Sequence, residues 1–88
     1  MENSINLSLQ VIPRVPSHIH SYDVVDKAIE VIQKSGLNYE VGPMETTIEG
    51  GMDECLAVVK EAQEACVAGG ALEVMSVIKI HYRPNSGV

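Results

Sequence analysis

Apolar and polar residues alternate strictly near the start of the chain. The apolar positions are Ile5, Leu7, Leu9 and Val11, and the polar positions between them are Asn6, Ser8 and Gln10. A period of two is typical of a β-strand with one buried face and one polar face. Pro13 and Pro16 follow, so we expect the strand to cover residues 5–12 and to end at Pro13.

The spacing of apolar residues then becomes helical in two segments. The first segment begins at Ser21, the expected N-cap, and ends at Gly36, the expected C-cap. Its expected buried stripe is Val25, Ala28, Ile29 and Ile32. The second segment runs from Gly51 to about Val67, with acidic residues in its first turn and Gly69-Gly70 as its stop.

Three further stretches have the character of strands. Leu37–Val41 and Glu45–Glu49 are separated only by a short break at Gly42-Pro43, which predicts an antiparallel hairpin. Glu73–Tyr82 is the last strand, and Pro84 stops it. In this strand we expect Val74, Ile78, Ile80 and Tyr82 on the helix side and Met75, Val77, Lys79 and His81 on the other side.

The element order is therefore strand, helix, strand, strand, helix, strand, within one α+β domain that covers residues 1–88. Right-handed connections through the two helices interleave the strands into one antiparallel four-stranded sheet. The expected spatial order of the strands is 4-1-3-2, with both helices on a single face. The opposite face of the sheet, here called the open face, is left without a helix.

The open face is expected to carry the polar side of each strand. The first and third strands are central neighbours, which brings Ser8 and Gln10 beside Thr47 and Glu49. Their hydroxyl, amide and carboxylate groups suit the edge of a heteroaromatic ring, and Met44 at the hairpin adds apolar contact. These five residues are our candidate ligand-binding residues. The same face could also stay in water or pair with a second copy of the chain.

Composition and charge narrow the function classes. The 88 residues carry twelve acidic and six basic side chains, a net charge of −6, and the basic residues are spread singly, which disfavours nucleic-acid binding. The sequence has no apolar run long enough for a membrane span and no secretory signal, so we expect a cytoplasmic protein without membrane contact. Cys55 and Cys66 lie on one helix face, roughly 16 Å apart, which indicates core thiols rather than a disulfide.

Other chemical groups in the sequence give weaker signals. His18, His20 and His81 are not accompanied by acidic or cysteine residues at a ligand spacing, so we expect no metal site. Gly50-Gly51 precedes a helix but lacks the remainder of a phosphate-binding motif. We find no nucleophile with a base and no defensible carboxylate pair, and we expect no catalytic residues and no cofactor.

Three stretches of the chain resemble the thiamine-binding, YkoF-like family. They are Ser8–Pro13, Gly36–Tyr39 and Gly42–Gly50, and the Pro-Met-x-Thr-x-Ile-Glu-Gly run within the last is the most specific. The resemblance implies a ferredoxin-like domain that associates through its sheets as a dimer or tetramer. It also implies binding of thiamine or hydroxymethylpyrimidine without turnover, for salvage or transport. The family often has an acidic residue in the last strand where this chain has His81, which leaves a ligand contact from that strand in doubt.

Two alternatives remain open beside a thiamine-binding or pyrimidine-binding module. The first is a structural or regulatory interaction protein that only oligomerises through its sheet and binds no small ligand. The second is a small enzyme on the same fold, which would need an acid or a histidine in an apolar pocket, with His81 as its obvious candidate.

Overall fold

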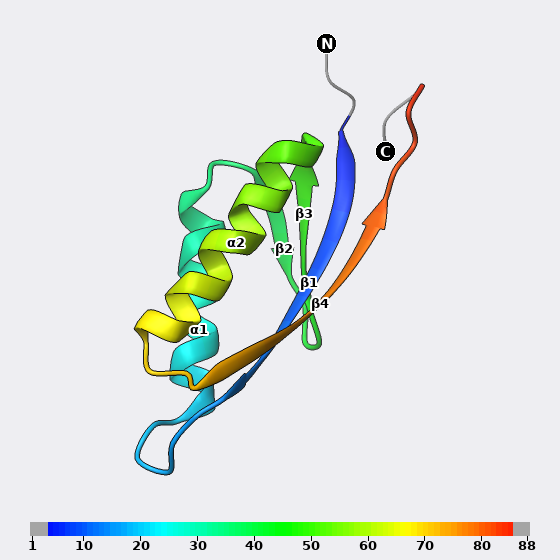
Figure 1. The fold of residues 1–88 in the computed structure, drawn as a ribbon. Coiled ribbons are helices and arrows are strands. Elements are labelled where there is room, and N and C mark those ends of the chain that lie inside the picture. The colour runs from blue at the N-terminus through cyan, green and yellow to red at the C-terminus, as the bar shows by residue number, and fades with distance from the viewer. Residues whose placement is uncertain (1–3, 86–88) are drawn as a thin grey trace.

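A computed structural model describes residues 4–85 and has the six predicted elements in the predicted order (Figure 1). The ends of the predicted domain, residues 1–3 and 86–88, lie outside the described residues. The elements are β1 (Ile5–Arg14), α1 (Ser21–Lys34), β2 (Asn38–Val41), β3 (Thr46–Gly50), α2 (Met52–Ala68) and β4 (Glu73–His81).

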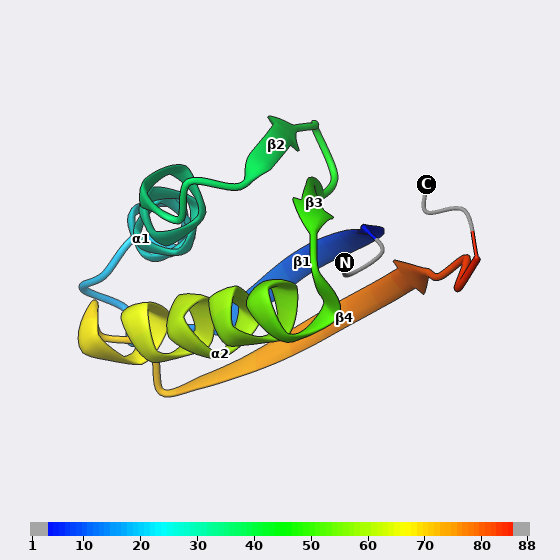
Figure 2. The ribbon, with the colours of Figure 1, turned by 90° about the horizontal axis from the view of Figure 1, so that it is seen from above.

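The four strands form one antiparallel sheet in the order β2-β3-β1-β4, which confirms the predicted topology. Both helices cover the same face of this sheet (Figures 1 and 2). The register pairs Leu7 with Ile80 and Leu9 with Ile78, so the predicted helix side of β4 is confirmed as well. Ile78 and Ile80 are nevertheless exposed because β4 is an edge strand.

The end of β1 was predicted wrongly. The strand continues through Pro13, which lies opposite Val74, and ends at Arg14. Pairing between β1 and β3 stops at Leu9, while β1 and β4 run on together past the tip of the hairpin (Figure 1). A proline is tolerated in a strand where its missing N–H would face an edge without a neighbour, and the β3 side of Pro13 is such an edge.

The start of α1 also differs from the prediction. His20, not Ser21, is the N-cap, and its Nδ1 accepts a hydrogen bond from the Tyr22 backbone N–H at 3.3 Å. The imidazole therefore satisfies one of the amide groups that the first turn leaves unpaired. At the other end, Ser35 is the C-cap and Gly36 follows with a φ of +82°, a backbone conformation that favours glycine.

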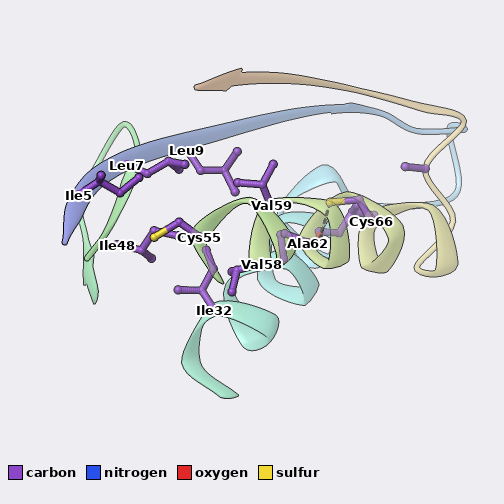
Figure 3. Close-up of a cluster of buried hydrophobic side chains, with 13 residues drawn as sticks. Ile5, Leu7, Leu9, Ile32, Ile48, Cys55, Val58, Val59, Ala62 and Cys66 are labelled. Atoms are coloured by element: carbon purple, nitrogen blue, oxygen red, sulfur yellow. Dashed lines mark hydrogen bonds between the residues drawn. The ribbon is translucent and has the colours of Figure 1, made fainter. Parts of the chain in front are cut away.

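The core lies between the two helices and the inner strands (Figure 3). Ile5, Leu7 and Leu9 line its β1 side, as the alternation predicted. On α1 the fully buried residues are Val24, Ala28 and Ile32, whereas Val25 and Ile29 of the predicted stripe are only half-buried. Cys55 and Cys66 are buried on α2 as predicted, and burial raises the pKa of the Cys66 thiol.

Candidate functional site

The open face of the sheet is organised as rows of side chains that cross all four strands. The central row contains Glu40, Thr47, Ser8 and Lys79, in the order β2, β3, β1, β4. Paired residues of an antiparallel sheet project to the same face, so these four side chains stand next to one another. The structure therefore brings two of the predicted site residues, Ser8 and Thr47, directly together.

The hydroxyl of Ser8 is the most unusual group on this face. Its Oγ is buried, yet no hydrogen-bond partner lies within reach of it among residues 4–85. A buried hydroxyl without a partner costs about 1–3 kcal/mol compared with a satisfied one, so such groups are rare in native structures and call for an explanation. An ordered water, a ligand or a second copy of the chain could supply the missing partner.

The next row toward the start of β1 contains the predicted carboxylate. Glu49 lies between Asn38 of β2 and Asn6 of β1, and His81 completes the row on β4. The Asn38 Nδ2 amide donates to Glu49 Oε1 at 3.2 Å. This contact leaves the second carboxylate oxygen of Glu49 as an acceptor for another donor.

Gln10 lies one row further along β1 than Ser8, opposite Val77. The Nζ atom of Lys79 lies 3.9 Å from Oε2 of Glu45, an ion pair that joins β4 to the hairpin across β1. An acid and a base thus stand on either side of the strand that carries Ser8 and Gln10. The spacing of residues along the chain gave no sign of this diagonal contact because it depends on two long side chains.

Shallow hollows accompany these rows at the hairpin. One of about 300 Å³ is lined by Met44, Thr47 and Glu45 together with Glu40, Gly42 and Pro43. A neighbouring one of about 290 Å³ is lined by Asn38, Glu40, Thr47 and Glu49 with Tyr39 and Ile48. Thr47 lines both hollows. Met44, which is 74% exposed, lines only the first of them. Glu40 also lines both and was absent from the predicted site, although its position on the open face follows from the alternation.

The site shows little sign of catalytic or metal chemistry. Among residues 4–85, no three histidine, cysteine or acidic side chains come together in a way that could hold a metal ion. His81 is exposed on the open face, so it lacks the apolar pocket that the enzyme alternative needs. Within the same part of the chain, the helices are too short or too polar to cross a membrane.

Comparisons with known proteins give a consistent result. A family model described as thiamine-binding protein matches residues 7–88. A UPF0045 protein of Clostridium perfringens is 48% identical over 81 residues, which cover 92% of this chain and 84% of that protein.

Solved structures agree with the sequence comparison. A domain of unknown function from Bacillus cereus, DUF77, superposes with a TM-score of 0.94 at 56% identity and covers 98% of this chain and 82% of its own. A Thermotoga maritima protein, named as a candidate thiamine biosynthesis/salvage protein, has a TM-score of 0.81 at 34% identity, over 91% of this chain and 84% of its own.

Proposed function

The chain belongs to the thiamine-binding protein family, and from that membership we propose that it binds thiamine, or the hydroxymethylpyrimidine part of thiamine, without chemical conversion. The proposed site is the open face around Ser8, Gln10, Met44, Thr47 and Glu49. The observation that carries this location is the buried Ser8 hydroxyl, which has no hydrogen-bond partner among residues 4–85 and lies in a polar row of the open face.

The chemistry of the ligand matches these groups. An aminopyrimidine presents amino hydrogens as donors and ring nitrogens as acceptors along its edge. The Glu49 carboxylate can accept from the amino group, and the Ser8 and Thr47 hydroxyls can donate to the ring nitrogens. A hydrogen bond to an ionised carboxylate is the stronger kind, so Glu49 should contribute the largest single share.

The charge of the chain suits the other half of thiamine. The thiazolium ring is a cation, the chain carries a net charge of −6, and Glu40 and Glu45 line the hollow next to Thr47. Met44 in that hollow offers a polarisable apolar contact for a flat ring. A carboxylate-lined hollow stabilises a cation more than a neutral ring.

The open face would bind its ligand at an interface between copies of the chain. Ile12, Met75 and Val77 lie on this face beyond Gln10 and are 46%, 65% and 44% exposed, which favours burial against a second copy. A dimer or tetramer formed through the sheets would enclose the shallow hollows. Salvage or transport of thiamine is the role we propose for such a binding protein.

The apolar end of the open face also supports the alternative of an interaction protein without a ligand. In that case the polar rows would pair with their copies, and Ser8 would find its partner in the second chain. The two functions differ in whether the assembled protein takes up thiamine.

Calorimetric titration of the assembled protein with thiamine and with hydroxymethylpyrimidine tests the proposal. We expect binding to the wild type, and we expect Glu49→Gln to weaken it by roughly tenfold because the charge-assisted hydrogen bond is lost. Glu64→Gln, the same substitution at an exposed position of α2, is the matched control and should bind like the wild type. Absence of heat with both compounds at tens of micromolar protein would remove the support for the proposed function.

A further inference from the structure

Two ion pairs connect side chains among residues 4–85, and they differ in the strands that they join. Arg14 and Glu73 lie directly opposite each other on β1 and β4, which are neighbours in the sheet. Lys79 belongs to β4, whereas Glu45 immediately precedes β3, and β1 lies between those two strands. The contact between Lys79 and Glu45, here called the Lys79–Glu45 bridge, therefore spans a whole strand.

The place where the bridge crosses β1 follows from the register. Lys79 lies directly opposite Ser8 on one side of β1. The register of β1 with β3, continued by one residue, places Glu45 level with Gln10 on the other side. The Lys79 Nζ nevertheless reaches to 3.9 Å from the Glu45 Oε2. The Lys79 side chain therefore crosses β1 on the open face, between Ser8 and Gln10.

This crossing accounts for the burial of the Ser8 hydroxyl on a face that no helix covers. The two residues opposite Ser8 are Thr47 and Lys79, and only Lys79 has a side chain long enough to extend across β1. A lysine stem can cover neighbouring groups while its ammonium group stays in water, and the Lys79 side chain is 74% exposed. The cover over the Ser8 hydroxyl is thus held in place by one exposed ion pair.

The acidic partner in the bridge also lines the hollow proposed for the cationic ring. The Glu45 side chain is 38% exposed, about half as much as that of Lys79, and it lines this hollow together with Glu40 and Met44. In the ligand-free protein the Lys79 ammonium group is the cation that neutralises Glu45. An exposed ion pair is weak, so a cation that enters the hollow can displace the ammonium group from the carboxylate.

We propose that Lys79 is an internal counter-ion that determines the charge of the ligand that the open face prefers, a role that rests on the proposed function. Any ligand that bonds the Ser8 hydroxyl must first break the Lys79–Glu45 bridge. A cationic ligand then neutralises Glu45 in place of Lys79, whereas a neutral ligand leaves that carboxylate without a counter-ion. The released ammonium group stays close to the site and repels a cationic ligand, which limits the preference for it.

The test compares thiamine, which is a cation, with neutral hydroxymethylpyrimidine on the intact protein. Removal of the ammonium group in Lys79→Gln favours the cation most, so calorimetry should show that the ratio of thiamine affinity to hydroxymethylpyrimidine affinity rises by about threefold, the size expected for an exposed charge pair. Glu45→Gln removes the carboxylate and should lower the same ratio by a similar factor.

Lys60→Gln is the matched control for the change in net charge. Lys60 is exposed on α2, which covers the opposite face of the sheet (Figure 1). This variant loses the same charge as Lys79→Gln but should keep the affinity ratio of the wild type. The difference between Lys79→Gln and the wild type should also shrink at about 1 M salt, because salt screens exposed charges.

The outcomes separate the role of Lys79 from the proposed function. If Lys79→Gln and Lys60→Gln both keep the ratio of the wild type while Glu49→Gln still weakens binding, the role of Lys79 is wrong and the proposed function stands. A fall of the ratio in Lys79→Gln would overturn that role in the same way. If none of these proteins binds either compound, the proposed function falls, and the role of Lys79 falls with it.

Discussion

The two faces of the sheet are formed by the same strands but differ in burial and in hydrogen bonding. On the helix face, Leu7 of β1 is fully buried and packs into a core that closes around it (Figure 3). On the open face, Ser8, the next residue, has a buried hydroxyl that nothing in the described chain satisfies. The core that stabilises the fold therefore lies on one face, and the unsatisfied hydroxyl lies on the other.

This separation explains how so small a domain can carry a polar site. A buried hydroxyl without a hydrogen-bond partner lowers the stability of the ligand-free protein, and a chain of 88 residues has little stability to lose. The buried core residues on the other face of the same strands stabilise the fold and offset this loss of stability. Substitutions on the helix face should consequently lower the free energy of unfolding, whereas substitutions on the open face should mainly change ligand binding.

The largest effect is expected on the helix face. Leu7→Ala removes a fully buried side chain between the sheet and α2 and should lower the free energy of unfolding by about 2–5 kcal/mol. Urea denaturation followed by circular dichroism measures this change. A loss below about 0.5 kcal/mol, the range of neutral surface substitutions, would contradict the division between the two faces.

A smaller effect of the opposite sign is expected one residue further on. Ser8→Ala deletes the hydroxyl without a partner and should raise the free energy of unfolding of the ligand-free protein by about 1 kcal/mol. The same variant should gain less stability from added thiamine than the wild type does. A clear loss of ligand-free stability would mean that a second copy already satisfies Ser8, in favour of the interaction protein.

The smallest effect is expected at the ion pairs of the open face. Lys79→Gln breaks the contact with Glu45, and because the Lys79 side chain is 74% exposed, the free energy of unfolding should change by less than about 0.5 kcal/mol. Thermal unfolding at low and high salt measures the difference. A larger, salt-dependent loss would show that the open face contributes to stability as the helix face does.

Most of the fold could be predicted because its apolar residues follow two simple patterns, alternation in the strands and helical spacing in the helices. The alternation in β1 determines which residues face the helices, and the right-handed connections determine that β1 and β3 are neighbours. The adjacency of Ser8 and Thr47 follows from those two facts together. Gln10 and Glu49 were expected side by side, but they lie in rows on opposite sides of the Ser8–Thr47 row, because alternation gives the face of a residue but not its register.

The errors arose where the outcome depends on neighbours in space. Pro13 looked like a strand end, but its effect depends on whether a strand lies on its N–H side, and β3 stops before that point. Ser21 looked like the N-cap because serine is a common cap, yet the His20 imidazole occupies that role. The pocket of about 210 Å³ between α1 and the hairpin was not foreseen, because it lies where β3 ends before the C-terminal part of β1.

The central claim is that the open face holds a heterocycle, and a crystal structure of the assembled protein grown with thiamine tests it most directly. We expect thiamine on the open face, with a ring edge within hydrogen-bond distance of the Ser8 Oγ and the Glu49 carboxylate. An open face that is filled only by a second copy of the chain, with Ser8 bonded to that copy and no thiamine present, would contradict the account.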